Sequence, residues 1–178
     1  GAKYGLKHDQ WVDERFDPEM ATRAAARHLR DLYHEFGDWY LAIAAYNCGQ
    51  GNVDKAVAKT GYADVWELRS RGTLPLETSN YVPIILAMTI MSKNPANYGI
   101  DAIIPDEPLL YDSVELHSLT SLALVSDVLG LPVSELKEYN PALLRDFAPA
   151  GYKLHIPRGT GPALLSGLEL VPSERRAS

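Results

Sequence analysis

Residues 44–53, which read "AAYNCGQGNV", form the corner around which the fold of this chain is organised. An apolar run of helical character ends here in a tyrosine, an asparagine and a cysteine. Two glycines then interrupt the helix before another helical pattern begins. On these residues alone the stretch has two interpretations. Tyr46 and Asn47 are a core aromatic residue and a helix-capping residue of a plain corner, or they form one wall of an active site.

The sequence on either side of this corner is helical. Residues 17–19 (Asp-Pro-Glu) are typical of a helix start, because an acidic cap and a first-turn proline favour a helix N-terminus. Asp38 can cap the helix that leads into the corner, and Asn52 can cap the helix that follows it. Pro83 must either kink its helix or lie within the first turns. The apolar spacing predicts helices at residues 17–36, 39–47, 53–60, 63–69 and 77–92.

The pattern changes beyond residue 99. Residues 100–111 are acidic and proline-rich, which predicts a linker. Residues 112–158 then read as strand, helix, helix and strand, at 113–117, 119–129, 132–139 and 152–156. Residues 159–178 are predicted to be a partly disordered tail. We therefore expect a mainly α chain, with a helical domain over residues 1–99 followed by a small α+β unit.

Composition and charge limit the classes of function that the chain can have. The chain has 17 Lys and Arg against 23 Asp and Glu, a net charge of −6, and no basic stripe, which argues against nucleic acid as a partner. The acidic excess lies mainly in residues 100–178, which carry 6 basic against 11 acidic side chains. The apolar run at residues 82–91 is shorter than the roughly 20 residues that a membrane helix needs, and no signal peptide is visible.

No cofactor or metal ion is predicted. His28 and His34 are six residues apart and therefore lie on different faces of a helix, and no His-Glu-x-x-His motif is present. The Gly-x-Gly at residues 49–51 follows a helix, whereas a dinucleotide-binding loop follows a strand. Cys48 is the one cysteine and has no histidine close in sequence, so we interpret it as a small corner residue in preference to a nucleophile.

Two motifs read together carry a family resemblance. "AAYNCGQGNVDKAV" (44–57) followed by "LPLETSNYVPIILA" (74–87) resembles the lytic transglycosylases of bacterial cell walls, which belong to the lysozyme-like superfamily. The similarity is greatest to the membrane-bound type D branch. The family's Ala-Tyr-Asn-x-Gly element corresponds to residues 45–49, and its Tyr-Val-Pro element to residues 81–83. This resemblance covers residues 1–99 and implies a partial lysozyme-like helical domain (an SLT domain), truncated at its N-terminus.

The second unit resembles a LysM module, a small βααβ domain that binds glycans containing N-acetylglucosamine. The matching text is "LTSLALVSDVLGLPVSELKEYNPALLRDFAPAGYKLHIP" (119–157). The Gly-Asp-Thr that usually follows the first strand is replaced by residues 117–120, His-Ser-Leu-Thr. The resemblance therefore implies a degenerate LysM-like module over residues 112–158.

The resemblance also implies a substrate, a reaction and a location. Lytic transglycosylases cleave the β-1,4 bond between N-acetylmuramic acid (MurNAc) and N-acetylglucosamine (GlcNAc) in peptidoglycan and form a 1,6-anhydro ring on MurNAc. One glutamate acts as general acid and then as general base. We expect a cell-envelope protein, periplasmic or outer-membrane associated, whose partner is the peptidoglycan glycan strand.

That glutamate belongs to a Glu-Ser element in the family, and no Glu-Ser pair occurs in this sequence. We therefore expect no catalytic residue in this chain, with the general acid lying upstream of Gly1. The glutamates considered as substitutes, none of which we expect to act as the acid, are Glu14, Glu35, Glu67 and Glu77. The expected substrate-binding residues are Tyr46, Asn47, Glu77 and Tyr81.

Two alternatives stay open at this point. The chain is a non-catalytic peptidoglycan-binding protein that uses the cleft and the LysM-like unit to hold cell wall. Otherwise it is an unrelated helical interaction module in which the Tyr-Asn corner is structural.

Overall fold

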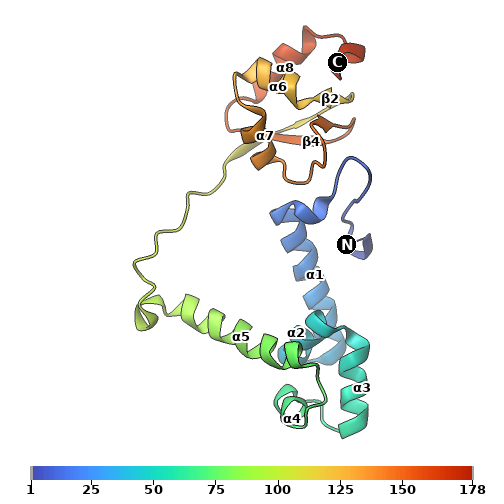
Figure 1. Cartoon of the computed structure of the whole chain (residues 1–178), viewed down its shortest axis with the longest axis vertical. Coiled ribbons are helices and arrows are strands. Elements are labelled where there is room, and N and C mark those ends of the chain that lie inside the picture. The colour runs from blue at the N-terminus through green and yellow to red at the C-terminus, as the bar shows by residue number, and fades with distance from the viewer. Residues whose placement is uncertain (1, 178) are drawn as a thin grey trace. The chain divides into compact units, whose positions relative to one another are not determined.

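The computed structural model describes residues 2–177 and divides into two compact units, shown in Figure 1. We call residues 25–106 the helical unit, and residues 2–24 together with 107–177 the mixed unit. Helix α1 (Pro18–Phe36) contributes its first turns to the mixed unit and the rest to the helical unit. Each unit has its own apolar core. The expected class, mainly α with a small α+β unit, is confirmed.

The helical unit packs around the second of its helices. Its elements after α1 are α2 (Trp39–Cys48), α3 (Gln50–Thr60), α4 (Val65–Ser70), α5 (Leu76–Lys93) and the 3-10 helix η3 (Pro95–Tyr98). Helix α2 is apolar almost all round, which is typical of a helix surrounded by neighbours. Its buried side chains meet those of α3, α4 and α5 in one core, which includes Leu41, Ala45, Val53, Leu68 and Val82.

The helix starts at Asp17 and Asp38 are as predicted. The Asp17 carboxylate accepts a hydrogen bond from the Met20 backbone N–H at 2.8 Å, and Asp38 accepts one from Leu41 at 2.8 Å. The prediction for Asn52 is wrong. Helix α3 begins at Gln50, so Asn52 lies inside it and its amide donates to the Cys48 carbonyl at 2.7 Å.

Pro83 lies well inside α5, and its effect on the helix is offset by a neighbour. Proline has no N–H, so the carbonyl four residues earlier, that of Ser79, loses its helical partner. The Arg69 guanidinium, from α4, donates from Nε to this carbonyl at 2.9 Å. A side chain from another helix thus replaces the backbone hydrogen bond that Pro83 removes.

The mixed unit contains the strand–helix–helix–strand order that the sequence predicts. Strands β1 (Tyr111–Glu115) and β4 (Lys153–Pro157) pair antiparallel, and Val114 lies opposite Leu154. Helices α6 (Leu122–Leu129) and α7 (Val133–Tyr139) lie between them in sequence. A second antiparallel pair, β2 (Thr120–Ser121) with β3 (Phe147–Ala148), was not predicted. The unit also contains the 3-10 helices η1 (Ala2–Tyr4), η2 (Glu14–Phe16) and η4 (Ser173–Arg175).

The expectation of a partly disordered tail is wrong for residues 161–169. They form α8 (Gly161–Glu169), whose Leu164 and Leu168 are buried in the core of the mixed unit. The Asp112 carboxylate holds the start of α8 by accepting hydrogen bonds from Gly159 and Gly161, both at 2.9 Å.

The N-terminal segment also belongs to the mixed unit. Val12 is 1% exposed and is part of the core that α6, α7 and β4 form. Its neighbours form backbone hydrogen bonds: Leu144 donates to the Trp11 carbonyl at 2.9 Å, and Asp13 donates to the Ala142 carbonyl at 2.8 Å. The apolar spacing of residues 1–99, which we expected to form one domain, gives no sign of these contacts.

Candidate functional site

The corner at residues 44–53 is a sharp junction between α2 and α3. Gly49 closes α2 by donating its N–H to the Ala45 carbonyl at 2.8 Å, and α3 begins at the next residue. Its φ of +87° lies in a region that side chains disfavour. An added Cβ would meet no atom within 4 Å, so the backbone angle, and not lack of space, favours glycine here.

Asn47 connects this corner to α5. Its Oδ1 accepts a hydrogen bond from the Thr78 hydroxyl at 2.7 Å, and its Nδ2 donates to Glu77 Oε1 at 3.1 Å. Thr78 is 1% exposed, so this end of the contact is shielded from water. The structure therefore brings together two of the residues expected at the site, Asn47 and Glu77, which lie 30 positions apart. Thr78 was not among the expected site residues, although it directly follows Glu77.

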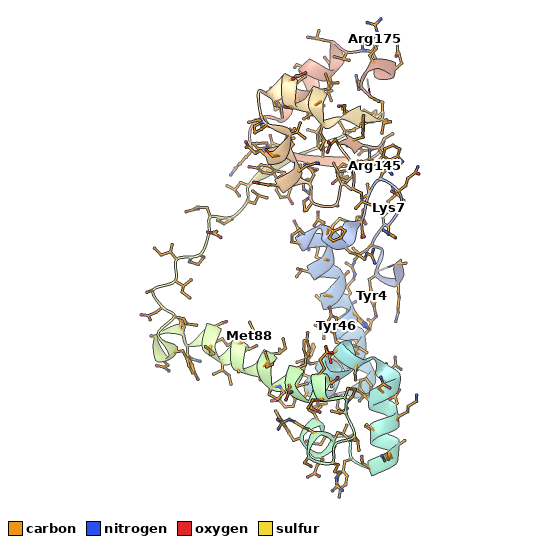
Figure 2. The ribbon with its side chains drawn as sticks, viewed as in Figure 1. Tyr4, Lys7, Tyr46, Met88, Arg145 and Arg175 are labelled. Carbon is orange, nitrogen blue, oxygen red and sulfur yellow. The ribbon has the colours of Figure 1, made fainter. Side chains whose placement is uncertain are left out.

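The two tyrosines expected at the site lie on the helices that Asn47 connects. Tyr46, labelled in Figure 2, is 37% exposed and is therefore not a core residue, contrary to the simpler interpretation of the corner. Its ring lies 5.5 Å from that of His28 on α1, measured between centroids. Tyr81 lies on α5 one helical turn beyond Glu77 and is half-buried.

The glutamates considered as substitutes for the missing acid are all engaged as acceptors. Glu77 accepts from Asn47, Glu35 accepts from the Gln50 amide, and Glu67 forms an ion pair with Arg71 at 3.2 Å. These three side chains are exposed. Glu14, in the mixed unit, accepts from the Lys7 backbone N–H at 2.6 Å. A general acid usually lies in a sheltered cleft, and the three exposed glutamates do not.

Cys48 has the surroundings of a packing residue. It is half-buried against the core of the helical unit, and its thiol lies 3.7 Å from the Gly49 carbonyl. Within residues 2–177, no group of three or more His, Cys, Asp or Glu side chains is placed to hold a metal ion.

The arrangement around Asn47 leaves hydrogen-bonding capacity for a ligand. An asparagine amide has two N–H donors and two acceptor lone pairs. Thr78 uses one lone pair and Glu77 uses one N–H, and within the described part of the chain no other hydrogen bond to this amide is present, so one of each is left on a side chain whose orientation is fixed. Such a fixed donor and acceptor, beside exposed Tyr46, suits recognition of a hydroxyl-rich or amide-bearing molecule.

Comparisons with known proteins identify the class. Residues 1–68 match the transglycosylase SLT domain, and residues 111–171 match the LysM-like domain of the lytic transglycosylase MltD. In both parts, and in this order, the chain is similar to lytic transglycosylases. The family and module inferred from the motifs are thus confirmed.

The similar individual proteins include type D enzymes. The chain is 39% identical, over 145 residues, to the membrane-bound lytic murein transglycosylase D of Escherichia coli strain K12. The protein of the same name from Escherichia coli O6:H1 strain CFT073 gives the same identity. The matched region is 79% of this chain and 31% of each relative. The chain therefore spans about a third of the length of these relatives.

Proposed function

We propose that this chain is part of a peptidoglycan lytic transglycosylase that cleaves the MurNAc-β-1,4-GlcNAc bond and leaves a 1,6-anhydro-MurNAc end. The observation that carries the proposal is a pair of hydrogen bonds at Asn47, which accepts from Thr78 and donates to Glu77 and so connects the two family motifs. The match to the transglycosylase SLT domain and the names of the type D relatives support it.

The proposed roles of the site residues follow from their contacts. Asn47 contacts the sugar with its remaining donor and acceptor, while Glu77 holds its amide in place. Tyr46 offers an exposed ring to the glycan. The role of Tyr81 comes from the family resemblance and not from a contact: it helps to orient the general acid. The substrate is the peptidoglycan glycan strand and the location is the cell envelope, periplasmic or outer-membrane associated; among residues 2–177 no helix is long and apolar enough to cross a membrane.

We further propose that residues 1–178 alone do not turn over glycan, because they supply no general acid. The support is the state of the glutamates in the helical unit. Three of them are exposed: Glu35 and Glu77 each accept a hydrogen bond, and Glu67 forms an ion pair. The glutamate that performs the proton transfers is then not one of these residues.

The test is to incubate the chain with purified peptidoglycan and to measure two outcomes. Mass spectrometry of the soluble fraction is expected to find no 1,6-anhydromuropeptides, and their release by this chain would refute the lack of an acid. In a co-sedimentation assay, the chain is expected to be found in the pellet with the peptidoglycan. Binding without lysis is also what the non-catalytic alternative predicts. A longer protein that carries a family Glu-Ser element before these residues separates the two, because only a transglycosylase then shows activity.

Asn47→Ala tests the proposed site within that experiment. It removes the groups offered to the sugar, and we expect peptidoglycan binding to weaken by roughly tenfold, the size of one good hydrogen bond to a ligand. Asn97→Ala, a matched change at an exposed asparagine of the same unit, is expected to bind as the parent does. Equal binding by both variants would show that the Asn47 corner is structural only.

A further inference from the structure

Residues 7–14 form a short hairpin whose shape is set by its own hydrogen bonds, and we call it the N-terminal hairpin. At its base, the Glu14 backbone N–H donates to the Lys7 carbonyl at 2.9 Å, and the Lys7 N–H donates to the Glu14 carboxylate at 2.6 Å. At its tip, the Asp9 carboxylate accepts from two backbone N–H groups, at 2.7 and 2.9 Å. All these bonds join close neighbours in the sequence, so the turn is specified locally.

The tip of this hairpin is inserted into the part of the mixed unit that matches the LysM-like domain, residues 111–171. Val12 is 1% exposed there, and it forms an antiparallel β-bridge with Leu143 in the loop that follows α7. The two backbone hydrogen bonds that flank this bridge measure 2.9 and 2.8 Å. Backbone pairing along an extended segment, with one side chain in a pocket, is a recurring mode of peptide recognition.

The loop that receives the hairpin is held from behind by Asn140, which is 2% exposed. The Asn140 amide donates to the carbonyls of Leu136 and His155 at 2.8 and 2.6 Å and accepts from the His155 N–H at 2.9 Å. The Asn140 carbonyl accepts from the Leu143 N–H at 3.0 Å. None of these four bonds involves the hairpin, so the receiving surface is preorganised for its occupant.

The rim of the contact is polar and aromatic. Arg145, labelled in Figure 2 as is Lys7 of the hairpin, donates from Nε to the Gln10 carbonyl at 3.3 Å. Its guanidinium lies 5.9 Å from the centroid of the Trp11 ring, and Trp11 is half-buried. One buried apolar side chain inside a rim of this kind is the composition of a small interface.

We propose that the LysM-like part of this chain is a docking module for a protein segment, and that the N-terminal hairpin is the segment it binds. The hairpin lies within residues 1–68, which match the SLT domain, so the module holds sequence of the transglycosylase match. The contact consists of one buried valine and the three hydrogen bonds given above, and it opens while the β1–β4 pair stays folded. This role is independent of the function proposed for the corner at Asn47.

The first test is native-state hydrogen exchange of the full chain. The N–H groups of Asp13 and Leu144 are the backbone donors of the contact, whereas the Leu116 N–H donates to the Tyr152 carbonyl, at 2.9 Å, beside the β1–β4 pair. We expect the protection factors of Asp13 and Leu144 to be roughly tenfold or more below that of Leu116, because the hairpin opens by itself. Equal protection at all three would show that the hairpin unfolds only with the whole unit and would overturn the proposal.

Val12→Asp in the full chain tests the contact directly, because an unpaired carboxylate is not tolerated in an apolar core. We expect the amide chemical shifts of residues 142–144 to change, while Leu116 stays protected from exchange because the β1–β4 pair remains folded. The matched control is Gln10→Asp, which adds the same charge at an exposed position of the hairpin and should leave both readouts as in the parent. Loss of protection at Leu116 in Val12→Asp would show that Val12 is an integral part of the core and not a docked residue.

The open Val12→Asp chain is then a receptor for the hairpin added in trans. The probe is a synthetic peptide of residues 5–17, GLKHDQWVDERFD, titrated into the isotope-labelled variant. We expect the amide shifts of residues 142–144 to return toward those of the parent chain, whose filled contact should bind the peptide roughly tenfold or more weakly.

The same peptide with Val12→Asp is the control and should have no effect up to about 2 mM. No binding of the unmodified peptide at that concentration, or equal binding of the two peptides, would refute the docking role. Since the readout lies at residues 142–144, neither outcome depends on whether the cleft at Asn47 binds glycan.

Discussion

Replacement of Arg69 by methionine should destabilise the helical unit through a single carbonyl. Pro83 removes the helical partner of the Ser79 carbonyl, and Arg69 Nε donates to it at 2.9 Å. Methionine keeps most of the length and apolar stem of arginine but cannot donate. Since Ser79 is only 8% exposed, its carbonyl is then left with little access to water.

The expected magnitude follows from the type of bond. Hydrogen bonds that involve a charged group contribute about 1.5–3 kcal/mol, so Arg69→Met should cost about 2 kcal/mol of unfolding free energy. In a unit of this size, roughly 1 kcal/mol corresponds to 4–8 °C in the thermal midpoint. Arg30→Met, at an exposed position of α1 in the same unit, should stay within about 0.5 kcal/mol of the parent.

The decisive assay is a double-mutant cycle with Pro83→Ala, followed by hydrogen exchange of residues 76–93. Exchange is preferable to a global melt because the two units need not unfold together. Alanine at position 83 restores an N–H that reaches the Ser79 carbonyl, so the cost of Arg69→Met should fall below about 0.5 kcal/mol in that background. An equal cost in both backgrounds, or a cost equal to that of Arg30→Met, would refute the reasoning.

Two further predictions concern the mixed unit. Asn140→Ala should lower the unfolding free energy of the mixed unit by about 2 kcal/mol, because the Asn140 amide donates to the His155 carbonyl at 2.6 Å and accepts from the His155 N–H at 2.9 Å. In urea unfolding, this variant should have a lower midpoint than the control Asn97→Ala, which changes an exposed asparagine. Similar midpoints for the two variants would contradict the prediction. The Arg15 guanidinium lowers the pKa of Asp13 from 3.8 to about 2. The stabilising effect of the Asp13–Arg15 ion pair is therefore complete above about pH 4 and is lost as the pH falls through about 2. Asp13→Asn should reduce the pH dependence of the unfolding midpoint in that window, and an unchanged slope would count against this cause.

The features that the sequence predicted correctly are local. Asp38 caps α2 because a carboxylate directly before a helix can reach the free N–H groups of its first turn, whatever surrounds it. The strand–helix–helix–strand order of residues 111–157 follows from apolar spacing and from glycines such as Gly130, which ends α6 with a φ of +66°. In both cases the deciding residues are neighbours in the chain.

The features that sequence reasoning missed depend on partners elsewhere. Asn52 is a good capping residue, but the turn at Gly49 lets α3 begin earlier, so the helix no longer needs that cap. Leucines 164 and 168 are spaced for one helix face, yet two glycines in so short a segment weaken the signal, and α8 is fixed by Asp112 instead. The burial of Val12 in the mixed unit has no local signature at all.

The corner at Asn47 shows why the structural and the functional interpretations of a motif need not compete. Thr78 and Glu77 each occupy one part of the Asn47 amide, and both bonds hold α5 against α2. The same bonds fix the direction of the donor and acceptor that stay available. A ligand that meets a side chain already held in place does not have to order it, and less affinity is lost on binding. Stability and glycan affinity should therefore fall together in Asn47→Ala, and a loss of stability by itself is not evidence against a role in binding.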